Sequence, residues 1–180
     1  MEIRHLDIPG LIEFIPVAYM DARGKFLETF RQDVLMKMGI NITFVQDNQS
    51  FSKKDVLRGI HFQKTPYEQG KLVHVVSGSA LDVAVDLRPE SEFFGRYQSI
   101  ILDSDLNNIF YIPEGFGHGF LALEDCILQY KCTKYYNPQA DSGIVWNDPE
   151  LKIKWGIKNP ILSEKDAKLP PFKSFKLKME

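Results

Sequence analysis

Short segments in which large apolar residues alternate with small or polar ones run through most of this chain, and they limit what it can fold into. In Leu81–Leu87 the odd positions are large and apolar, whereas the even positions are small or acidic. A period of two indicates a β-strand, because successive side chains point to opposite faces. Gly, Pro, Asn and Asp separate such segments at close spacing. Many short strands of this kind predict an all-β barrel or jelly roll.

Helical patterns are few. Gln32–Met38 is predicted to form a short helix ended by Gly39, and Ser163–Lys168 a second one, near the C-terminus, stopped by Pro170–Pro171. No repeat, low-complexity tract or linker divides the chain. Because 180 residues are enough for one sizeable core, we expect a single domain over residues 1–180.

The composition is that of an ordinary globular protein, with 44% hydrophobic and 26% charged residues. A net charge of −2 gives no overall field that attracts nucleic acid or a membrane surface, so neither is an expected partner. Met1–His5 lacks the apolar segment of a signal peptide, and no apolar run is long enough to span a bilayer. Cys126 and Cys132 indicate neither a disulfide framework nor a zinc site. We therefore expect a cytoplasmic protein.

Three polar residues stand in apolar strand patterns. His61 lies within Val56–Gln63, Lys71 opens the next strand, and Tyr130 alternates onto the apolar face of a third. Each has an ordinary structural explanation, since a strand histidine is usually hydrogen-bonded, a lysine solvated and a tyrosine packed. Together, however, a base, a cation and a phenol form a set suited to proton transfer through an anionic intermediate.

The strand pattern also places these residues. Lys71 shares its strand face with two valines, as expected of a barrel lining that is polar at the mouth and apolar deeper in. Arg58 and His61 have opposite parity, so a regular strand would separate them. A bulge at Gly59 could bring both to one side, which the sequence leaves open.

A metal site is not expected. The histidines stand far apart, with none two residues from another: His5, His61, His74 and His118. A catalytic metal needs about three protein ligands.

Two other kinds of site are also not expected. Cys132 has no adjacent base and is interpreted as a small core residue. Gly115–Gly119 lacks the spacing and the following helix of a phosphate-binding loop.

A series of short motifs, taken in order, is similar to the dTDP-4-dehydrorhamnose 3,5-epimerases of the cupin superfamily. The matching motifs are Asp21–Gly24, Gln46–Asn48, Leu57–Gln63, Gln69–Val73, Asp82–Arg88, Ile112–Phe116, Tyr130–Lys131, Tyr135–Tyr136, Trp146–Asp148 and Leu162–Asp166. Each motif alone is weak, but their order over about Phe14 to Asp166 is specific.

The resemblance implies a cupin-type jelly-roll barrel that forms a homodimer, with Asp21–Gly24 reaching the partner's pocket. It implies an isomerase without a cofactor, which epimerises dTDP-4-keto-6-deoxy-D-glucose at C3 and C5 to dTDP-4-keto-L-rhamnose in dTDP-L-rhamnose biosynthesis. In that reaction His61 would be the base, Tyr130 the acid, and Lys71 the cation that holds the enolate oxygen.

The resemblance further implies a set of substrate contacts, with Tyr136 against the thymine ring. The other matching positions are Arg23, Glu28, Gln46, Asn48, Arg58, His118, Asp141 and Lys165. The two arginines suit a diphosphate through forked, charge-assisted hydrogen bonds. The family usually has Glu where Asp141 stands, so that contact is expected to be shorter or absent.

Two acids have alternative roles. Asp166 follows Ser163 by three residues, as in a capping box, whereas the family resemblance assigns it to orienting the catalytic histidine. Asp82 could pair with Lys71 or face solvent, and is not expected to be catalytic.

Two other functions remain open at this stage. One is a mono-epimerase or ketoisomerase that acts on a related nucleotide 4-keto sugar. The other is a non-catalytic cupin that binds sugars, which the intact His61, Lys71 and Tyr130 argue against. These three residues do not show whether the enzyme inverts one carbon or two. They also do not identify the nucleotide of the substrate.

Overall fold

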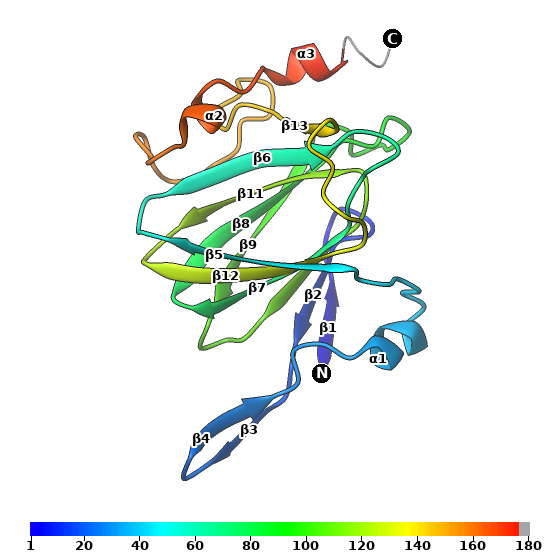
Figure 1. The fold of residues 1–180 in the computed structure, drawn as a ribbon, viewed down its shortest axis with the longest axis vertical. Coiled ribbons are helices and arrows are strands. Elements are labelled where there is room, and N and C mark those ends of the chain that lie inside the picture. Colours follow the sequence, from blue (N-terminus) through cyan, green and yellow to red (C-terminus); the bar gives the residue numbers. More distant parts are fainter. Residues whose placement is uncertain (177–180) are drawn as a thin grey trace.

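Two twisted β-sheets packed face to face form the body of the protein, as a computed structural model shows (Figure 1). The structure describes residues 1–176. The last four residues of the single domain predicted over 1–180 lie outside the described residues. The all-β class predicted from the alternating pattern is confirmed.

The structure has thirteen strands among the described residues. They are β1 (Glu2–His5), β2 (Ile12–Ile15), β3 (Ala18–Asp21), β4 (Gly24–Leu27), β5 (Gln46–Ser52), β6 (Leu57–Gln63), β7 (Lys71–Ser77), β8 (Ser79–Asp86), β9 (Tyr97–Asp103), β10 (Ile109–Ile112), β11 (Phe116–Ala122), β12 (Cys126–Cys132) and β13 (Asp141–Gly143). The short helices are α1 (Gln32–Lys37), α2 (Glu164–Ala167) and α3 (Phe172–Lys176).

The larger sheet has the strand order β1-β2-β10-β7-β12-β5, and the smaller one β13-β6-β11-β8-β9. Strands β3 and β4 form a separate hairpin, which projects from the lower end of the barrel in Figure 1. Helices α2 and α3 lie above β6, on the outer side of the smaller sheet (Figure 1). None of the described helices is long and apolar enough to cross a membrane.

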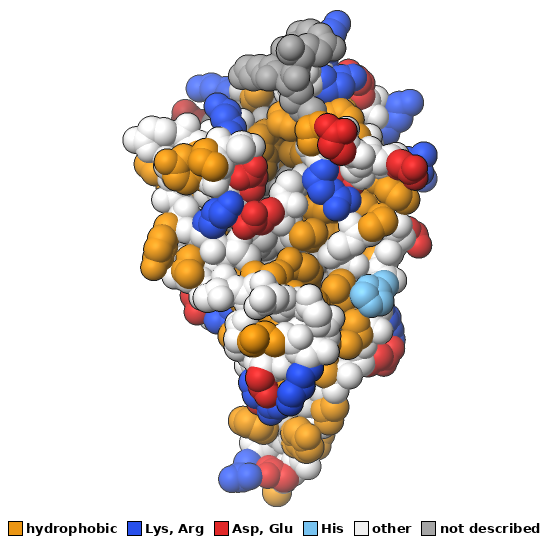
Figure 2. Space-filling model, turned by 90° about the vertical axis from the view of Figure 1, so that its right-hand side faces the viewer, with side chains coloured by type: hydrophobic (Ala, Val, Ile, Leu, Met, Phe, Trp, Pro, Cys, Tyr) orange, Lys and Arg blue, Asp and Glu red, His pale blue; other side chains and the backbone are white. Residues whose placement is uncertain are grey.

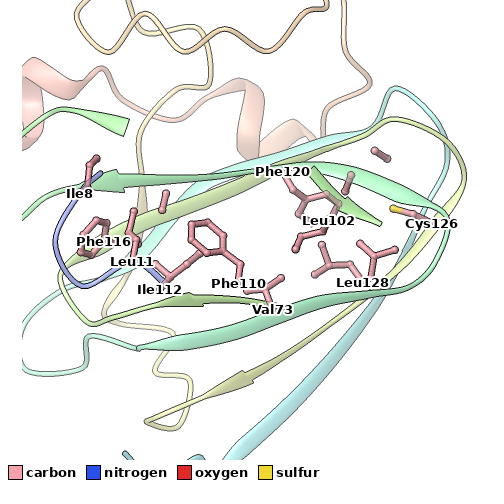
Figure 3. Packing of buried hydrophobic residues seen from close by; sticks show 14 residues of the cluster. Ile8, Leu11, Val73, Leu102, Phe110, Ile112, Phe116, Phe120, Cys126 and Leu128 are labelled. Carbon is pink, nitrogen blue, oxygen red and sulfur yellow. The ribbon is translucent and has the colours of Figure 1, made fainter. Parts of the chain in front are cut away.

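Apolar side chains fill the space between the sheets (Figure 3). Val73, Phe110 and Leu128 come from the larger sheet, and Leu102 and Phe120 come from the smaller one. All five are buried, and Val73 is one of the two valines that were predicted to line the barrel beside Lys71. The barrel is therefore a packed core at this level, and any open space must lie nearer its mouth.

Strand β8 is buried on both faces. Its residues Ala80 and Ala84 face the barrel core, whereas Val83 and Val85 pack against the chain that follows β13, including Trp155. The C-terminal segment thus covers the outer face of the smaller sheet. This covering explains why the odd positions of Leu81–Leu87 are so consistently apolar.

A bulge in β6 brings Arg58 and His61 to one face. His61 pairs with His118 and Arg58 with Phe120, so β6 has one residue more than β11 between these pairs. Directly paired residues of antiparallel strands point to the same side of the sheet. The bulge at Gly59, which the sequence had left open, is confirmed.

The two predicted helices are confirmed as α1 and α2, and Ser163 caps α2 by accepting a hydrogen bond from the Asp166 backbone N–H at 3.0 Å. Helix α3 was not predicted. It has five residues, too few to show a helical period, and it depends on contacts made in the folded chain. Its first residue, Phe172, donates its backbone N–H to Asp148 Oδ2 at 2.8 Å.

Candidate active site

A cavity of about 280 Å³ opens between the sheets and gathers most of the predicted site residues. The predicted residues that line it are Gln46, Asn48, His61, Lys71, Tyr130, Tyr136, Asp141 and Lys165. A neighbouring cavity of about 560 Å³ is larger but is lined by none of the three proton-transfer residues. Titratable groups in a concave site are the better guide to function, so the smaller cavity is the candidate active site.

Residues for proton transfer come from both walls of this cavity. His61 is on β6 of the smaller sheet, and Lys71 and Tyr130 are on β7 and β12 of the larger sheet. Lys71 Nζ lies 5.5 Å from the centre of the Tyr130 ring. A molecule in the cavity would therefore meet an imidazole on one side and a phenol and an ammonium group on the other.

Asp166 contacts the imidazole of His61. Its Oδ1 atom lies 2.5 Å from His61 Nε2, and this arrangement leaves Nδ1 as the free ring nitrogen. Burial alone would raise the pKa of Asp166, but the hydrogen bonds from His61 and Ser163 and the charge of Lys165 outweigh it and lower that pKa. Asp166 therefore stays ionised and can fix the tautomer and orientation of His61. The contact agrees with the expected pairing, and the backbone of the same residue serves the helix cap.

Lys71 is partly buried and reaches a second histidine. Its Nζ atom lies 3.3 Å from His118 Nδ1, and His118 Nε2 lies 3.0 Å from both carboxylate oxygens of Asp82. Burial lowers the pKa of Lys71 and that of His118. Asp82 thus neither faces solvent nor contacts Lys71 directly. Its position between Ala80 and Ala84 on the inward face of β8 was the only sequence signal for this role.

Tyr130 has the protonation state that a donor needs. Its ring is partly buried and packs against the core of the barrel, as its strand parity predicted. Burial raises the pKa of its hydroxyl. The phenol is therefore protonated at neutral pH and available to give a proton.

Polar groups around Tyr136 form the outer part of the cavity. The Tyr136 backbone N–H donates to Gln46 Oε1 at 2.9 Å, and Gln46 Nε2 donates to Asn48 Oδ1 at 3.0 Å. The Tyr136 hydroxyl donates to Asp141 Oδ2 at 3.2 Å, and Lys165 forms an ion pair with the same oxygen. The half-exposed Tyr136 ring is thus held at the rim, where a flat ring could stack on it.

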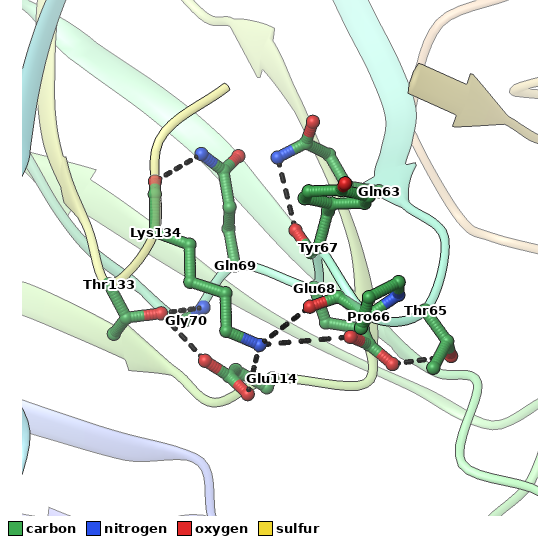
Figure 4. Close-up of polar contacts among 10 residues, drawn as sticks. All are labelled: Gln63, Thr65, Pro66, Tyr67, Glu68, Gln69, Gly70, Glu114, Thr133 and Lys134. Atoms are coloured by element: carbon green, nitrogen blue, oxygen red, sulfur yellow. Dashed lines mark hydrogen bonds and ion pairs between the residues drawn. The ribbon is translucent and has the colours of Figure 1, made fainter. Parts of the chain in front are cut away.

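Two glutamines that were not among the predicted site residues also line the cavity. Gln63 donates its amide to Tyr67 O at 3.1 Å and accepts from the Asn137 backbone N–H at 2.7 Å, and Gln69 donates to Lys134 O at 2.7 Å. Figure 4 shows the bond from Gln69 that joins the loop between β6 and β7 to the chain that follows β12, and the bond from Gln63 to Tyr67 within that loop. The loop joins the strands of His61 and Lys71, so the network fixes their separation.

Lys134 also contacts the loop between β6 and β7, through its side chain. Its ammonium group donates to Pro66 O at 3.1 Å and pairs with Glu114 at 3.3 Å and Glu68 at 3.8 Å (Figure 4). These partners come from the β6–β7 loop and from the turn between β10 and β11. Lys134 therefore joins three chain segments at the mouth of the barrel.

Arg58 lies beside the cavity rather than in its lining. Its guanidinium group donates to Ser52 Oγ at 3.0 Å and to Phe51 O at 3.1 Å, both on β5. These bonds hold the side chain across the gap between the two sheets. One further cationic contact with a bound anion is compatible with this position, because guanidinium has five N–H donors.

Arg23 and Glu28 are not brought to the cavity of their own protomer. Arg23 is at the tip of the β3–β4 hairpin and pairs with Asp21 at 2.6 Å, and Glu28 pairs with Arg31 at 3.6 Å. Figure 2 shows acidic and basic side chains around a hollow in the upper half of the molecule, and apolar side chains near its projecting lower end. The hairpin forms that lower end (Figure 1).

Within residues 1–176, no group of three His, Cys, Asp or Glu side chains is arranged to hold a metal ion. Cys126 and Cys132 are buried free thiols. The described cavity offers His61, Lys71 and Tyr130 as side chains for acid–base chemistry.

Several known proteins are similar to this chain in sequence and in fold. The sequence profile described as dTDP-4-dehydrorhamnose 3,5-epimerase matches residues 5–174. An enzyme of that name from Methanothermobacter thermautotrophicus is 46% identical over 170 residues, covering 92% of this chain and 91% of the relative.

Solved structures agree with the sequence match. The dTDP-6-deoxy-D-glucose-3,5-epimerase of Legionella pneumophila, solved with dTDP-4-keto-L-rhamnose, superposes with a TM-score of 0.94 at 40% identity, covering 99% of this chain and 96% of that one. A 3'-monoepimerase of Streptomyces bikiniensis, solved with dTDP-quinovose, gives 0.90 at 32% identity, covering 97% and 89%. The profile match over nearly the whole chain, with the shared cupin-type fold, shows that this chain belongs to the dTDP-4-dehydrorhamnose 3,5-epimerase family.

Proposed function

We propose that this protein is an isomerase that epimerises dTDP-4-keto-6-deoxy-D-glucose at C3 and C5 to give dTDP-4-keto-L-rhamnose, for dTDP-L-rhamnose biosynthesis. The single observation that supports the mechanism is the placement of His61 and Tyr130 on opposite sheets of one cavity. Inversion of a carbon centre requires proton removal from one face and proton return from the other.

The substrate supplies much of the reactivity. Protons at C3 and C5 flank the C4 ketone, so the carbanion left by their removal delocalises onto the ketone oxygen as an enolate. His61, oriented by Asp166, removes the proton through its free Nδ1 atom. The ammonium group of Lys71 stabilises the negative charge on O4. Tyr130 then donates its proton from the opposite face, and no redox step or organic cofactor is needed.

The outer part of the cavity suits the nucleotide. In this proposal Tyr136 stacks on the thymine ring, and the amide and carboxylate groups around it contact the nucleoside, which their positions at the rim of the cavity support. Arg58 and Lys165 supply positive charge for the diphosphate. The relative solved with dTDP-4-keto-L-rhamnose supports this class of ligand.

The test is to incubate the protein with dTDP-4-keto-6-deoxy-D-glucose in deuterated water and to read deuterium at C3 and C5 by NMR, together with the configuration of the product. Incorporation and inversion at both carbons are expected. Incorporation at one carbon alone would show a mono-epimerase, and none at either carbon would show a binding protein. His61→Asn is the control, and it should abolish exchange at both positions.

A homodimer is part of the proposal. The hairpin places Arg23 away from its own cavity and exposes Tyr19, Met20 and Phe26, with 64%, 72% and 70% of their surface accessible. Apolar side chains of this size on a projecting hairpin favour burial against another chain. A second copy of this chain would receive Arg23 and Glu28 at its cavity.

We also propose that the enzyme needs no metal and acts in the cytoplasm. The described cavity offers His61, Lys71 and Tyr130 for each step, so no step requires a Lewis acid. Dialysis against a strong chelator should therefore leave the rate of product formation unchanged. Loss of activity that zinc or iron restores would contradict the assignment of the enolate site to Lys71.

A further inference from the structure

Two histidines of the site each contact a carboxylate, but their surroundings differ. His61 faces the cavity, and 32% of its side chain is exposed. His118 and Asp82 are buried, with side-chain exposures of 7% and 0%. The proton-transfer mechanism uses the first pair, whereas His118 of the buried pair was expected to contact the substrate and does not line the cavity. The Asp82–His118 pair touches Lys71, the cation of the proposed mechanism.

The geometry of the buried pair fixes the position of its protons. His118 Nε2 is 3.0 Å from both oxygens of Asp82, so Nε2 carries the proton and donates it to the carboxylate. The opposite ring nitrogen, Nδ1, is 3.3 Å from Lys71 Nζ. Burial lowers the pKa of His118, so the ring is neutral and Nδ1 accepts a hydrogen bond from the Lys71 ammonium group. The three groups therefore form a line from carboxylate through imidazole to ammonium.

Lys71 needs such a partner because it is partly buried at the base of the cavity and its charge is poorly solvated. Burial lowers its pKa, and negative charge at Cys132, Asp82 and Asp141 would oppose that effect. Burial raises the pKa of the Cys132 thiol, so this group is neutral at pH 7. Asp141 forms an ion pair with Lys165.

The other groups around Lys71 provide no counter-charge. Tyr130 is a neutral phenol on β12, and His61 on β6 is itself paired with Asp166. Asp82 on β8 is thus the one buried carboxylate among these groups that is connected to Lys71 and shared with no other cation. A buried charge persists only when an opposite charge compensates it.

We propose that Asp82 is a positioning residue, which acts through the His118 ring to keep Lys71 protonated and directed at the cavity. The inference rests on the proposed function, in which Lys71 stabilises the enolate. In this inference the Asp82–His118 pair keeps the cation Lys71 charged. The Asp166–His61 pair, in contrast, provides the base. Asp82 itself does not touch the substrate.

Asp82→Asn tests this role because it removes the charge and keeps the shape. The buried group would then have one net positive charge, and Lys71 should lose its proton at lower pH. The measurement is an NMR titration of the Lys71 side chain in protein labelled with ¹³C,¹⁵N-lysine, with the signal assigned by its absence in Lys71→Met. The titration midpoint should fall by about one pH unit or more.

Asp86→Asn is the matched control. Asp86 is on the same strand and equally buried, but it pairs with Arg88 at 2.6 Å. This change should lower stability and leave the Lys71 midpoint in place. Asp82→Ser provides the same test if Asp82→Asn does not fold. An unchanged Lys71 midpoint in a folded Asp82 variant would overturn the proposal.

Deuterium exchange at C3 and C5 separates this inference from the proposed function. If the inference and the proposed function both hold, the exchange rate falls at high pH as Lys71 loses its proton. In Asp82→Asn this fall should move to lower pH together with the Lys71 midpoint. If the midpoint moves and the exchange profile does not, the role of Asp82 is supported and the role of Lys71 in the reaction is wrong.

Discussion

A single acidic residue, Asp166, links the helix cap to the chemistry of the site. Its backbone N–H donates to Ser163 Oγ at 3.0 Å, while its carboxylate lies 2.5 Å from His61. The two contacts use different atoms, so the helix cap and the contact with His61 that the sequence presented as alternatives occur together. A substitution of the carboxyl group alone can therefore separate them.

We expect Asp166→Asn to lower kcat by about 10²-fold or more, because the amide cannot stabilise the protonated imidazole that forms when His61 removes a proton. Helix α2 should persist, since its cap uses the backbone. Glu164→Gln on the same helix, whose side chain is 96% exposed, is the control and should retain full kcat. An Asp166→Asn enzyme with normal kcat would contradict the dyad.

The same residue predicts a pH dependence of stability. Despite burial, His61, Ser163 and Lys165 hold the pKa of Asp166 below its ordinary value. As the pH falls below about 4, the unfolded chain therefore binds this proton before the folded one does, and the contribution is lost. The Tm advantage of the native protein over Asp166→Asn should be full near pH 6 and should shrink progressively as the pH falls below about 4. A difference in Tm that stays constant as the pH falls would contradict this linkage.

Individual residues show which parts of the candidate site could be predicted from the sequence. His61, Lys71 and Tyr130 were predicted from strand parity and the family motifs, and the structure places them around one cavity. Asp82 was not assigned correctly, because its partner lies on β11, 36 residues away along the chain. Strand parity gives the direction of a side chain and not the partner that it meets across a sheet.

At the scale of elements, the bulge in β6 decides which residues reach the site. Gly59 has a φ of +120°, and a Cβ atom at this position would lie 2.5 Å from Gly119 Cα. Both the backbone conformation and the close approach of β11 therefore require glycine. The bulge places Arg58 and His61 on one face of the strand.

We expect Gly59→Ala to lower the free energy of unfolding by about 3 kcal/mol or more, because backbone strain and overpacking add. Gly156→Ala is the control, since Gly156 also has a positive φ, of +78°, but a Cβ atom there would have no neighbour within 4 Å. Urea denaturation of both variants measures the difference. Equal losses would mean that close packing against β11 contributes nothing.

Elements with a clear local pattern were predicted, and those that depend on tertiary contacts were not. Strand β8 and helix α2 were evident from alternation and from the Ser163 cap. Helix α3 was missed, because its Phe172 is fixed by Asp148 and by the ring of Phe94. Both partners lie far from α3 in the sequence.

At the scale of the whole molecule, the β3–β4 hairpin is the part that the single chain leaves unpacked. Lys25 anchors it by donating to Ser104 O at 2.7 Å and to Asn107 Oδ1 at 2.8 Å, both between β9 and β10. The hairpin is thereby held away from its own cavity with its apolar side chains exposed. The motif at its tip was evident in the sequence, and its distance from the cavity of the same chain agrees with the reach toward a partner that the family resemblance implies.

Mixing two inactive variants tests the shared site. If Arg23 acts in the partner's cavity, a heterodimer of Arg23→Ala and His61→Asn has one complete site. Unfolding and refolding the mixture should therefore restore about a quarter of the native activity, because about half of the dimers are mixed. Sedimentation should show a dimer at micromolar concentration. No recovery from the mixture, or a monomer in the centrifuge, would contradict the proposed assembly.

The most direct test of the mechanism uses Tyr130→Phe and measures deuterium exchange and net inversion on one sample. His61 and Lys71 remain, so exchange at C3 and C5 should continue, with protons returned mainly to the face from which they came. Inversion should fall by about 10²-fold or more. Tyr111→Phe, a buried tyrosine outside the cavity lining, is the control and should change neither rate. An unchanged ratio of inversion to exchange in Tyr130→Phe would contradict the assignment of Tyr130 as the proton donor.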